Sequence, residues 1–212
     1  MYIRAKDAET RQDVLHALIA SHPFGTLVTH SEAGLAADHI PFEIAPATAA
    51  APLGILRAHV ARANPLWRLA GSAVMVVFQG PHAYISPSLF DEKAISGKVV
   101  PTWDYAVAHA HGTLAAIDDR AWLLALLNRL TDQHESTRAM QWAVADAPED
   151  YIDAMAQAIV GIEIPITRIE GKWKLNQTNP LSDQQRMAAD LSTRPETAPL
   201  GSLIAARLAP AP

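Results

Sequence analysis

Four apolar residues near the N-terminus recur at the spacing of one helix face: Val14, Leu15, Leu18 and Ile19. Side chains three and four residues apart lie on the same side of an α-helix, so the pattern predicts an amphipathic helix over residues 7–21. Pro23 cannot continue this helix and marks its end. Because a helix with one apolar stripe must bury it, we expect the helix to lie against a sheet.

Residues 24–44 show the pattern of two strands joined by a turn. The segment 24–30 and the segment 35–44 are rich in β-forming residues, and Gly34 between them is free to adopt a positive φ. We therefore predict a β-hairpin here. The Ala/Pro-rich stretch over residues 46–52 is expected to be a long hairpin loop rather than a linker between domains.

Later apolar patterns predict further strands over residues 53–59, 73–80, 107–118 and 158–170, with Gly171 turning the chain after the last of them. The clearest helical stripe is formed by Trp122, Leu123, Leu126, Leu127 and Leu130. Asp118 or Asp119 is expected to cap the N-terminus of this helix. A second helical piece is predicted over residues 148–156.

Strands dominate the first half of the chain and return near its end, without the regular strand–helix alternation of a parallel sheet. These elements favour a mainly β fold, an antiparallel barrel with peripheral α-helices. We expect one domain over residues 1–179, followed by a C-terminal helical tail over residues 180–212. The Ala, Pro and Thr content of the tail predicts looser order there.

Composition narrows the classes of partner. The net charge of -5 gives no electrostatic reason to approach nucleic acid, because DNA rewards clustered Lys and Arg. The chain has no cysteine, which excludes disulfides, thiolate metal sites and a Cys nucleophile. No apolar run has the length of a membrane span, and the N-terminus lacks the pattern of a signal peptide. We therefore expect a cytoplasmic protein without a membrane partner.

Histidine is the remaining residue type with obvious chemistry, because the common catalytic and nucleotide-binding motifs are missing from the sequence. His109 and His111 are two residues apart on a predicted strand and therefore share a face, from which both could ligate one metal. His134 and Glu135, at the end of the long helix, could complete such a site. Strand histidines more often bond backbone or solvent, so our expectation is that no metal is bound.

Three segments could contact an anion or a flat ring. Arg62 and Asn64 lie where a strand gives way to a helical turn, a junction whose backbone N–H groups suit a phosphate, although such an Arg is more often solvated. Lys172 and Lys174 alternate onto one face, either as an anion site or as lysines that protect a sheet edge. Trp103, within residues 101–105, either covers a ligand ring or anchors a loop in the core.

Several blocks of the sequence resemble, in this order, the PaiB family of FMN-binding negative transcriptional regulators: HIPF, HVARANPLW, FQGPHAYISPS, VVPTWDYAVAHAHG, LNRLTDQHE and AIVGIEIPITRIEGKWKLNQ. The resemblance extends from the N-terminal helix to about Asn179. It implies the FMN-binding split-barrel superfamily, which includes the pyridoxamine phosphate oxidases and heme-utilisation proteins. The implied fold is a six-stranded antiparallel split β-barrel. The implied assembly is a homodimer with FMN at the subunit interface.

The resemblance also implies where the flavin is held. The expected cofactor-binding residues are His39, Ile40, Pro41, His59, Ala61, Arg62, Asn64, Trp103, His111, Lys172, Lys174 and Gln177. Arg62 is the clearest cation for the phosphate, and the last three residues would complete the pocket from the partner subunit. One departure is Asp104, which stands where family members usually have Asn.

Three functions follow as hypotheses. The first is a flavin-binding negative regulator of transcription that acts indirectly or through a bound ligand, since the acidic chain lacks a basic stripe for direct DNA contact. The second is an FMN-dependent oxidoreductase, in which the isoalloxazine carries the chemistry and the protein needs no catalytic motif of its own. The third is a metal- or heme-handling protein that uses the histidines. The sequence identifies no catalytic residue.

Overall fold

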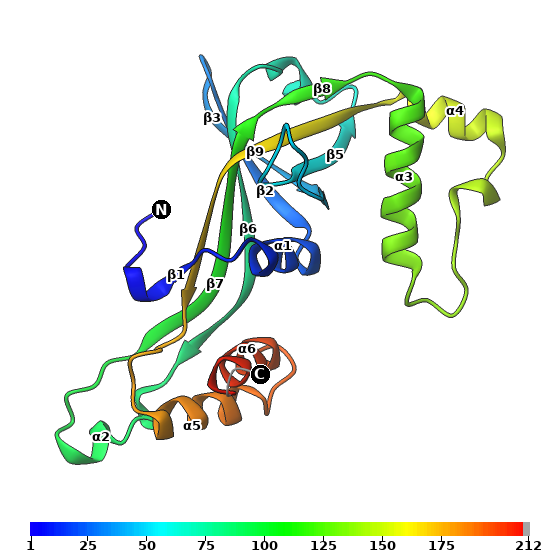
Figure 1. Cartoon of the computed structure of the whole chain (residues 1–212). Coiled ribbons are helices and arrows are strands. Elements are labelled where there is room, and N and C mark those ends of the chain that lie inside the picture. Colours follow the sequence, from blue (N-terminus) through cyan, green and yellow to red (C-terminus); the bar gives the residue numbers. More distant parts are fainter. Residues whose placement is uncertain (210–212) are drawn as a thin grey trace. The chain divides into compact units, whose positions relative to one another are not determined.

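The computed structural model describes residues 1–209, and Figure 1 labels its elements. The chain divides into two compact units, each assembled from separate segments. Unit 1 comprises Met1–Leu18, Gln79–Ala108 and Glu170–Pro212, of which residues 210–212 lie outside the description. Unit 2 comprises Ile19–Phe78 and His109–Ile169.

The strands are β1 (Ala8–Glu9), β2 (Phe24–Ser31), β3 (Gly34–Pro41), β4 (Glu43–Ala45), β5 (Ile55–Ala61), β6 (Ala73–Ile85), β7 (Thr102–Thr113), β8 (Ala115–Ile117) and β9 (Ile159–Lys174). They form a nine-stranded sheet with the order β3-β2-β6-β7-β9-β5-β4, in which β1 and β8 also pair with β9. The predicted mainly β antiparallel fold is confirmed, with three strands more than the six expected.

The α-helices are α1 (Gln12–Ser21), α2 (Glu92–Ile95), α3 (Arg120–Glu135), α4 (Glu149–Gln157), α5 (Leu181–Leu191) and α6 (Ala198–Leu208). Short 3-10 helices are η1 (Ala5–Asp7), η2 (Pro65–Leu69), η3 (Pro87–Leu89) and η4 (Val144–Asp146). Within the described part of the chain, no helix combines the length and the apolar character needed to cross a membrane.

Unit 2 is organised by antiparallel pairing. The predicted hairpin is confirmed as β2 and β3, with Phe24 opposite Pro41 and a turn in which Gly34 has φ 102°. The loop over residues 46–52 lies between β4 and β5, which pair with each other, as predicted. Alternating side chains of β2, β5, β6 and β9 are buried, and Phe42 packs edge to face on Phe78 at 5.8 Å between ring centroids.

The long helix α3 begins where the sequence predicts. Asp119 is its N-cap, because its carboxylate accepts a hydrogen bond from the Trp122 backbone N–H at 2.7 Å. The stripe buries Leu123, Leu126 and Leu130. A Cβ on Gly161 of β9 would lie 2.3 Å from the Trp122 ring, so a glycine here permits α3 to approach the sheet closely.

Unit 1 contains the ends of β6, β7 and β9 that lie outside unit 2, together with helices. Ala8 of β1 pairs with Lys172 of β9. Leu15 of α1, Met187 of α5 and Leu200 of α6 are fully buried. A Cβ on Gly201 would lie 2.9 Å from the Ala188 carbonyl oxygen, which shows how closely α6 approaches α5.

Four sequence predictions need correction. The first helix begins at Gln12 rather than residue 7, because η1 and β1 come before it. Gly171 does not turn the chain, since β9 continues through it to Lys174. The segment with Trp103 is the start of β7, not a loop return. The tail is ordered as α5 and α6 because both contribute buried apolar side chains to unit 1, which composition alone did not reveal.

Candidate functional site

Arg62, the predicted phosphate ligand, is already engaged by its own unit. Its two terminal nitrogens donate to the two carboxylate oxygens of Asp118 at 2.9 and 2.6 Å. It also donates to the backbone oxygens of Gln157 and Ile159. The hydrogen bonds from Arg62 lower the pKa of Asp118. Arg62 therefore ties the end of β5 to the segment before α3, the end of α4 and the start of β9, and a phosphate would have to share its guanidinium with Asp118 or displace that carboxylate.

Asn64 likewise has a structural part. Its side-chain oxygen accepts from the Leu66 backbone N–H at 2.9 Å and thereby caps η2. Its amide nitrogen donates to Asp38 at 2.9 Å. These bonds hold the turn after β5 against β3.

The predicted residues of β3 differ in what they can offer a ligand. His39 is exposed, and its Nδ1 lies 3.1 Å from the Thr26 hydroxyl. Ile40 is 5% exposed and belongs to the core. Pro41 is exposed and lines a cavity, whereas Ala61 at the end of β5 is exposed and is not part of the lining of that cavity.

That cavity, here called the His59 cavity, is a hollow of about 300 Å³ inside unit 2. Its lining consists of Pro41, His59, Leu127, Leu130, Thr131, His134, Glu135 and Trp142. The apolar half of this lining comes from the end of β3, from α3 and, with Trp142, from the segment after α3, while β5 contributes His59. An apolar hollow with a few convergent polar groups is the usual form of a small-molecule site.

His59 is the unusual group in this cavity. Its Nδ1 is buried and has no hydrogen-bond partner among the described residues. Burial lowers the pKa of His59, so its imidazole is neutral at physiological pH. Because a buried polar atom without a partner costs free energy, a ligand that bonds Nδ1 would recover that cost on binding.

His134 and Glu135 were expected as companions of His109 and His111 at a metal. They lie instead in the His59 cavity, where Glu135 accepts a hydrogen bond from the Trp142 backbone N–H at 3.1 Å. Sequence reasoning placed His59 and His134 in two different sites. The fold brings them to one cavity because α3 packs beside β5.

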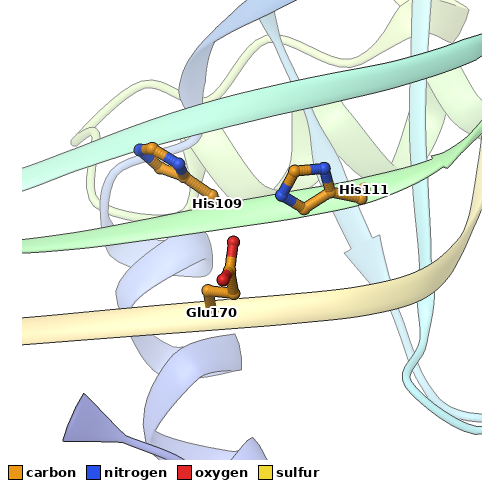
Figure 2. A group of neighbouring side chains, drawn as sticks. All are labelled: His109, His111 and Glu170. Atoms are coloured by element: carbon orange, nitrogen blue, oxygen red, sulfur yellow. The ribbon is translucent and has the colours of Figure 1, made fainter. Parts of the chain in front are cut away.

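Figure 2 shows His109 and His111 on β7 and Glu170 on β9. All three side chains are half-buried. Arg168 places a guanidinium nitrogen 3.1 Å from His111 Nδ1. That positive charge opposes a cation beside His111.

The expected flavin-binding residues of unit 1 are either exposed or bonded to other groups of that unit. Trp103 is 50% exposed, and its ring stacks on His82 at 5.8 Å between centroids, with Tyr84 at its edge. Lys172 lies over the Tyr105 ring, 5.4 Å from its centroid. Trp103 and Tyr84 leave aromatic surface accessible on one face of β6 and β7.

The Gln177 side chain forms hydrogen bonds with backbone groups of its own unit instead of lying free in an open site. Its amide nitrogen donates to the backbone oxygens of Lys6 and Trp173, and its oxygen accepts from the Leu175 N–H. All of its side-chain polar atoms therefore have partners within unit 1.

Asp104 was the unexplained departure in the sequence, and the structure gives it a place. It is fully buried, and one carboxylate oxygen accepts from the Asn176 amide at 3.0 Å. The other oxygen has no hydrogen bond and lies 3.5 Å from the Lys174 ammonium. Burial raises the pKa of Asp104 to about 6, an effect that Lys174 and Asn176 oppose. Asn176, which the sequence did not suggest, holds this carboxylate from a left-handed conformation with φ 51°.

Comparisons with known proteins give the relatives. A protein of Emericella nidulans described as uncharacterized is 35% identical over 84% of this chain and 84% of its own. The protease synthase and sporulation protein PAI 2 of Bacillus subtilis is 28% identical over 90% of this chain and 89% of its own.

Solved structures show the fold. The FAD and heme binding protein from Mycobacterium smegmatis matches with a TM-score of 0.60 and 18% identity, over 86% of this chain and 80% of its own. The flavocytochrome Anf3 from Azotobacter vinelandii matches with a TM-score of 0.61 and 12% identity, over 88% and 78%. The fold is that of the flavin-binding split barrels, with a sheet that does not close. The model of the family described as "Putative FMN-binding domain" matches residues 1–168, and the chain belongs to this family.

Proposed function

We propose that this chain binds FMN and that the His59 cavity receives the flavin ring. The observation that carries the proposal is His59, which lines the hollow and whose buried Nδ1 has no hydrogen-bond partner among the described residues. The whole lining of this cavity lies within residues 1–168, the span of the matched family. Lys172, Lys174 and Gln177 lie beyond that span, so the support for them as flavin ligands is the sequence resemblance alone.

The residues that line the cavity offer the flavin two kinds of contact. Pro41, Leu127 and Trp142 offer apolar surface to a flat ring, and His59 offers one hydrogen-bonding nitrogen. A volume of about 300 Å³ is at the small end for ligand pockets, so it suits the ring system while the ribityl phosphate extends outside it. When bound, FMN would supply hydride and single-electron chemistry.

A titration of FMN fluorescence tests this placement. His59→Leu roughly keeps the volume of the side chain but removes the ring nitrogens, and we expect it to weaken FMN binding about fivefold, since a hydrogen bond contributes ~1 kcal/mol. His30→Leu is the matched control, because His30 is an exposed strand histidine of the same unit that lies outside the cavity. If the two variants bind FMN with equal affinity, the flavin does not bind in the His59 cavity.

Arg62 and Asp118 provide a second test, of the phosphate position. If the phosphate takes Asp118's place, Arg62→Ala should weaken FMN binding by the ~1.5–3 kcal/mol of a charge-assisted hydrogen bond. Asp118→Asn should strengthen binding, because it frees the guanidinium from its competing carboxylate. Should both variants bind FMN like the wild type while unfolding more easily, Arg62 would be a structural residue only. Titration and thermal melts of the two variants supply both readouts.

The biological use we propose is regulation through the bound flavin. Its support is the likeness to a Bacillus subtilis protein named for protease synthesis and sporulation. With a net charge of -5, the chain favours an indirect route over direct contact with DNA.

Flavin-dependent oxidoreduction is the alternative, supported by the likeness to a flavocytochrome fold. Reduction of the bound FMN by a nicotinamide donor would favour the oxidoreductase. A bound FMN that the donor does not reduce would favour the regulator.

We further propose a homodimer. The support is the aromatic face of unit 1, where Tyr84 is 53% and Trp103 50% exposed on neighbouring strands. Covering such side chains with a second copy would remove apolar surface from water. Sedimentation velocity of the flavin-bound protein tests this state, which predicts the mass of two chains.

A further inference from the structure

Unit 1 contains a cavity that is larger than the His59 cavity and shares no lining residue with it. Its volume is about 710 Å³, within the usual range for ligand pockets. It is lined by Arg4, Lys6, Phe90, Asp91, Glu92, Ile95, Val99, Val100, Thr102, Lys174, Asn176, Thr178, Asn179, Pro180 and Asp183. We call it the Lys174 cavity. Its lining combines cations from the N-terminal segment and from the end of β9 with apolar side chains around α2.

Two of the three cations in the lining of this cavity have donors to spare. Lys6 donates to the neutral Thr178 hydroxyl at 2.9 Å and, among the described residues, forms no ion pair. Arg4 uses its Nε for Asp7 at 2.7 Å, and its two terminal nitrogens have no hydrogen bond within the described structure. Lys174 is fixed by Thr102, the Trp103 carbonyl and Asp104. An anionic group would therefore find free donors on Lys6 and Arg4.

The acidic residues of the lining are mostly matched by other groups. Asp91 pairs with Arg186 at 2.7 Å, and Asp183 pairs with the same guanidinium. Glu92 accepts from the Ser96 hydroxyl. Among the acidic residues of this lining, Glu92 alone has no cation beside it. Among its cations, Lys6 has no carboxylate partner.

Apolar side chains line the same cavity in unusually exposed positions. Ile95 is 76% and Val100 74% exposed, and both flank the turn at Gly97. Two large aliphatic side chains so exposed in one short segment gain stability only when something apolar covers them. Since both lie in the lining with the cations, one ligand can meet both requirements.

We propose that the Lys174 cavity binds an organic acid: an anionic head group bound by Lys6 and Arg4, on an apolar body that covers Ile95 and Val100. This site is separate from the proposed flavin site. Lys174 contributes positive charge to the head group while it remains held beside Asp104.

Calorimetric titration with octanoate tests the proposal, with octylammonium as a probe of the same apolar body and opposite charge. We expect octanoate to bind at one site per chain and at least tenfold more tightly than octylammonium. Absence of octanoate binding, or equal or tighter binding of octylammonium, would overturn the proposal.

Variants then locate the site. Ile95→Asp places a carboxylate against the bound anion and should weaken octanoate binding at least tenfold, and Lys6→Ala should weaken it severalfold. Leu35→Asp is the matched control, because Leu35 is an equally exposed aliphatic residue, at 78%, in unit 2. The Ile95 and Leu35 side chains are both on the surface, so the two Asp variants should keep their fold. If Ile95→Asp binds octanoate as the control does, the site is not this cavity.

The two proposals can fail separately. His59→Leu should leave octanoate binding unchanged, and Ile95→Asp should leave FMN binding unchanged. A loss of octanoate binding in His59→Leu would contradict the assignment to the Lys174 cavity, whatever the outcome with FMN.

Discussion

Replacing Lys174 by methionine is expected to lower the free energy of unfolding by about 3–5 kcal/mol at neutral pH. The reason is Asp104, which is fully buried and has Lys174 as its neighbouring cation at 3.5 Å. Removing one partner of a buried pair leaves the other charge in a medium that solvates it poorly. Urea unfolding at pH 7 measures the change.

The pH dependence separates this explanation from a simple loss of packing. Burial already raises the pKa of Asp104 to about 6, so its folded state holds the proton more tightly than its unfolded state. Such a group stabilises the fold at low pH, and that contribution is lost as pH rises from about 4 toward 6 and above. Without Lys174 the pKa rises further, so the deficit of Lys174→Met should shrink as pH falls from 7 to 5.

Two variants serve as controls. Asp104→Asn removes the carboxylate, so adding it to Lys174→Met should restore most of the lost stability. Lys172→Met changes a lysine two residues away on β9 that lies over Tyr105 and makes no pair with Asp104. A pH-independent deficit, or no recovery in the double variant, would show that Asp104 is not the cause.

Gly161→Ala is the second large effect expected, a loss of about 3 kcal/mol. The added Cβ would lie 2.3 Å from the Trp122 ring and 3.0 Å from the Ile117 carbonyl oxygen, so the ring must move. Because Trp122 lies in the first turn of α3, moving it also disturbs the helix that forms one wall of the His59 cavity. Thermal unfolding measures the stability, and FMN titration measures the cavity.

A second substitution tests the cause of that loss. Trp122→Leu shortens the obstructing side chain, so the double variant should be more stable than the sum of the two single losses predicts. Strict additivity of the two substitutions would contradict a clash between Gly161 and Trp122.

The sequence was informative wherever a structure depends on near neighbours. The β2–β3 hairpin followed from a glycine between two β-rich segments, and Asp119 capped α3 as its position before the apolar stripe implied. Such features are set by residues a few positions apart. The family resemblance then supplied the fold class that these local patterns left broad.

The candidate sites depend on residues far apart in the chain, where one sequence gives little warning. Arg62 pairs with Asp118, 56 positions away, and this changes its meaning from an open phosphate ligand to a tie between segments. Asp104 meets Asn176 across 72 positions. His59 and His134 had each been noticed, but their common cavity depends on how α3 packs beside β5. The C-terminal helices were underestimated for the same reason, since their burial depends on tertiary contacts.

Sedimentation velocity followed at the flavin absorbance band tests the central claim most directly. The purified chain is mixed with excess FMN, and the absorbing boundary shows how much flavin moves with the protein and at what mass. We predict one FMN per chain, sedimenting with the mass of two chains, and a loss of that bound flavin in His59→Leu at FMN concentrations near the wild-type dissociation constant. Flavin that remains entirely at the rate of free FMN would contradict the account.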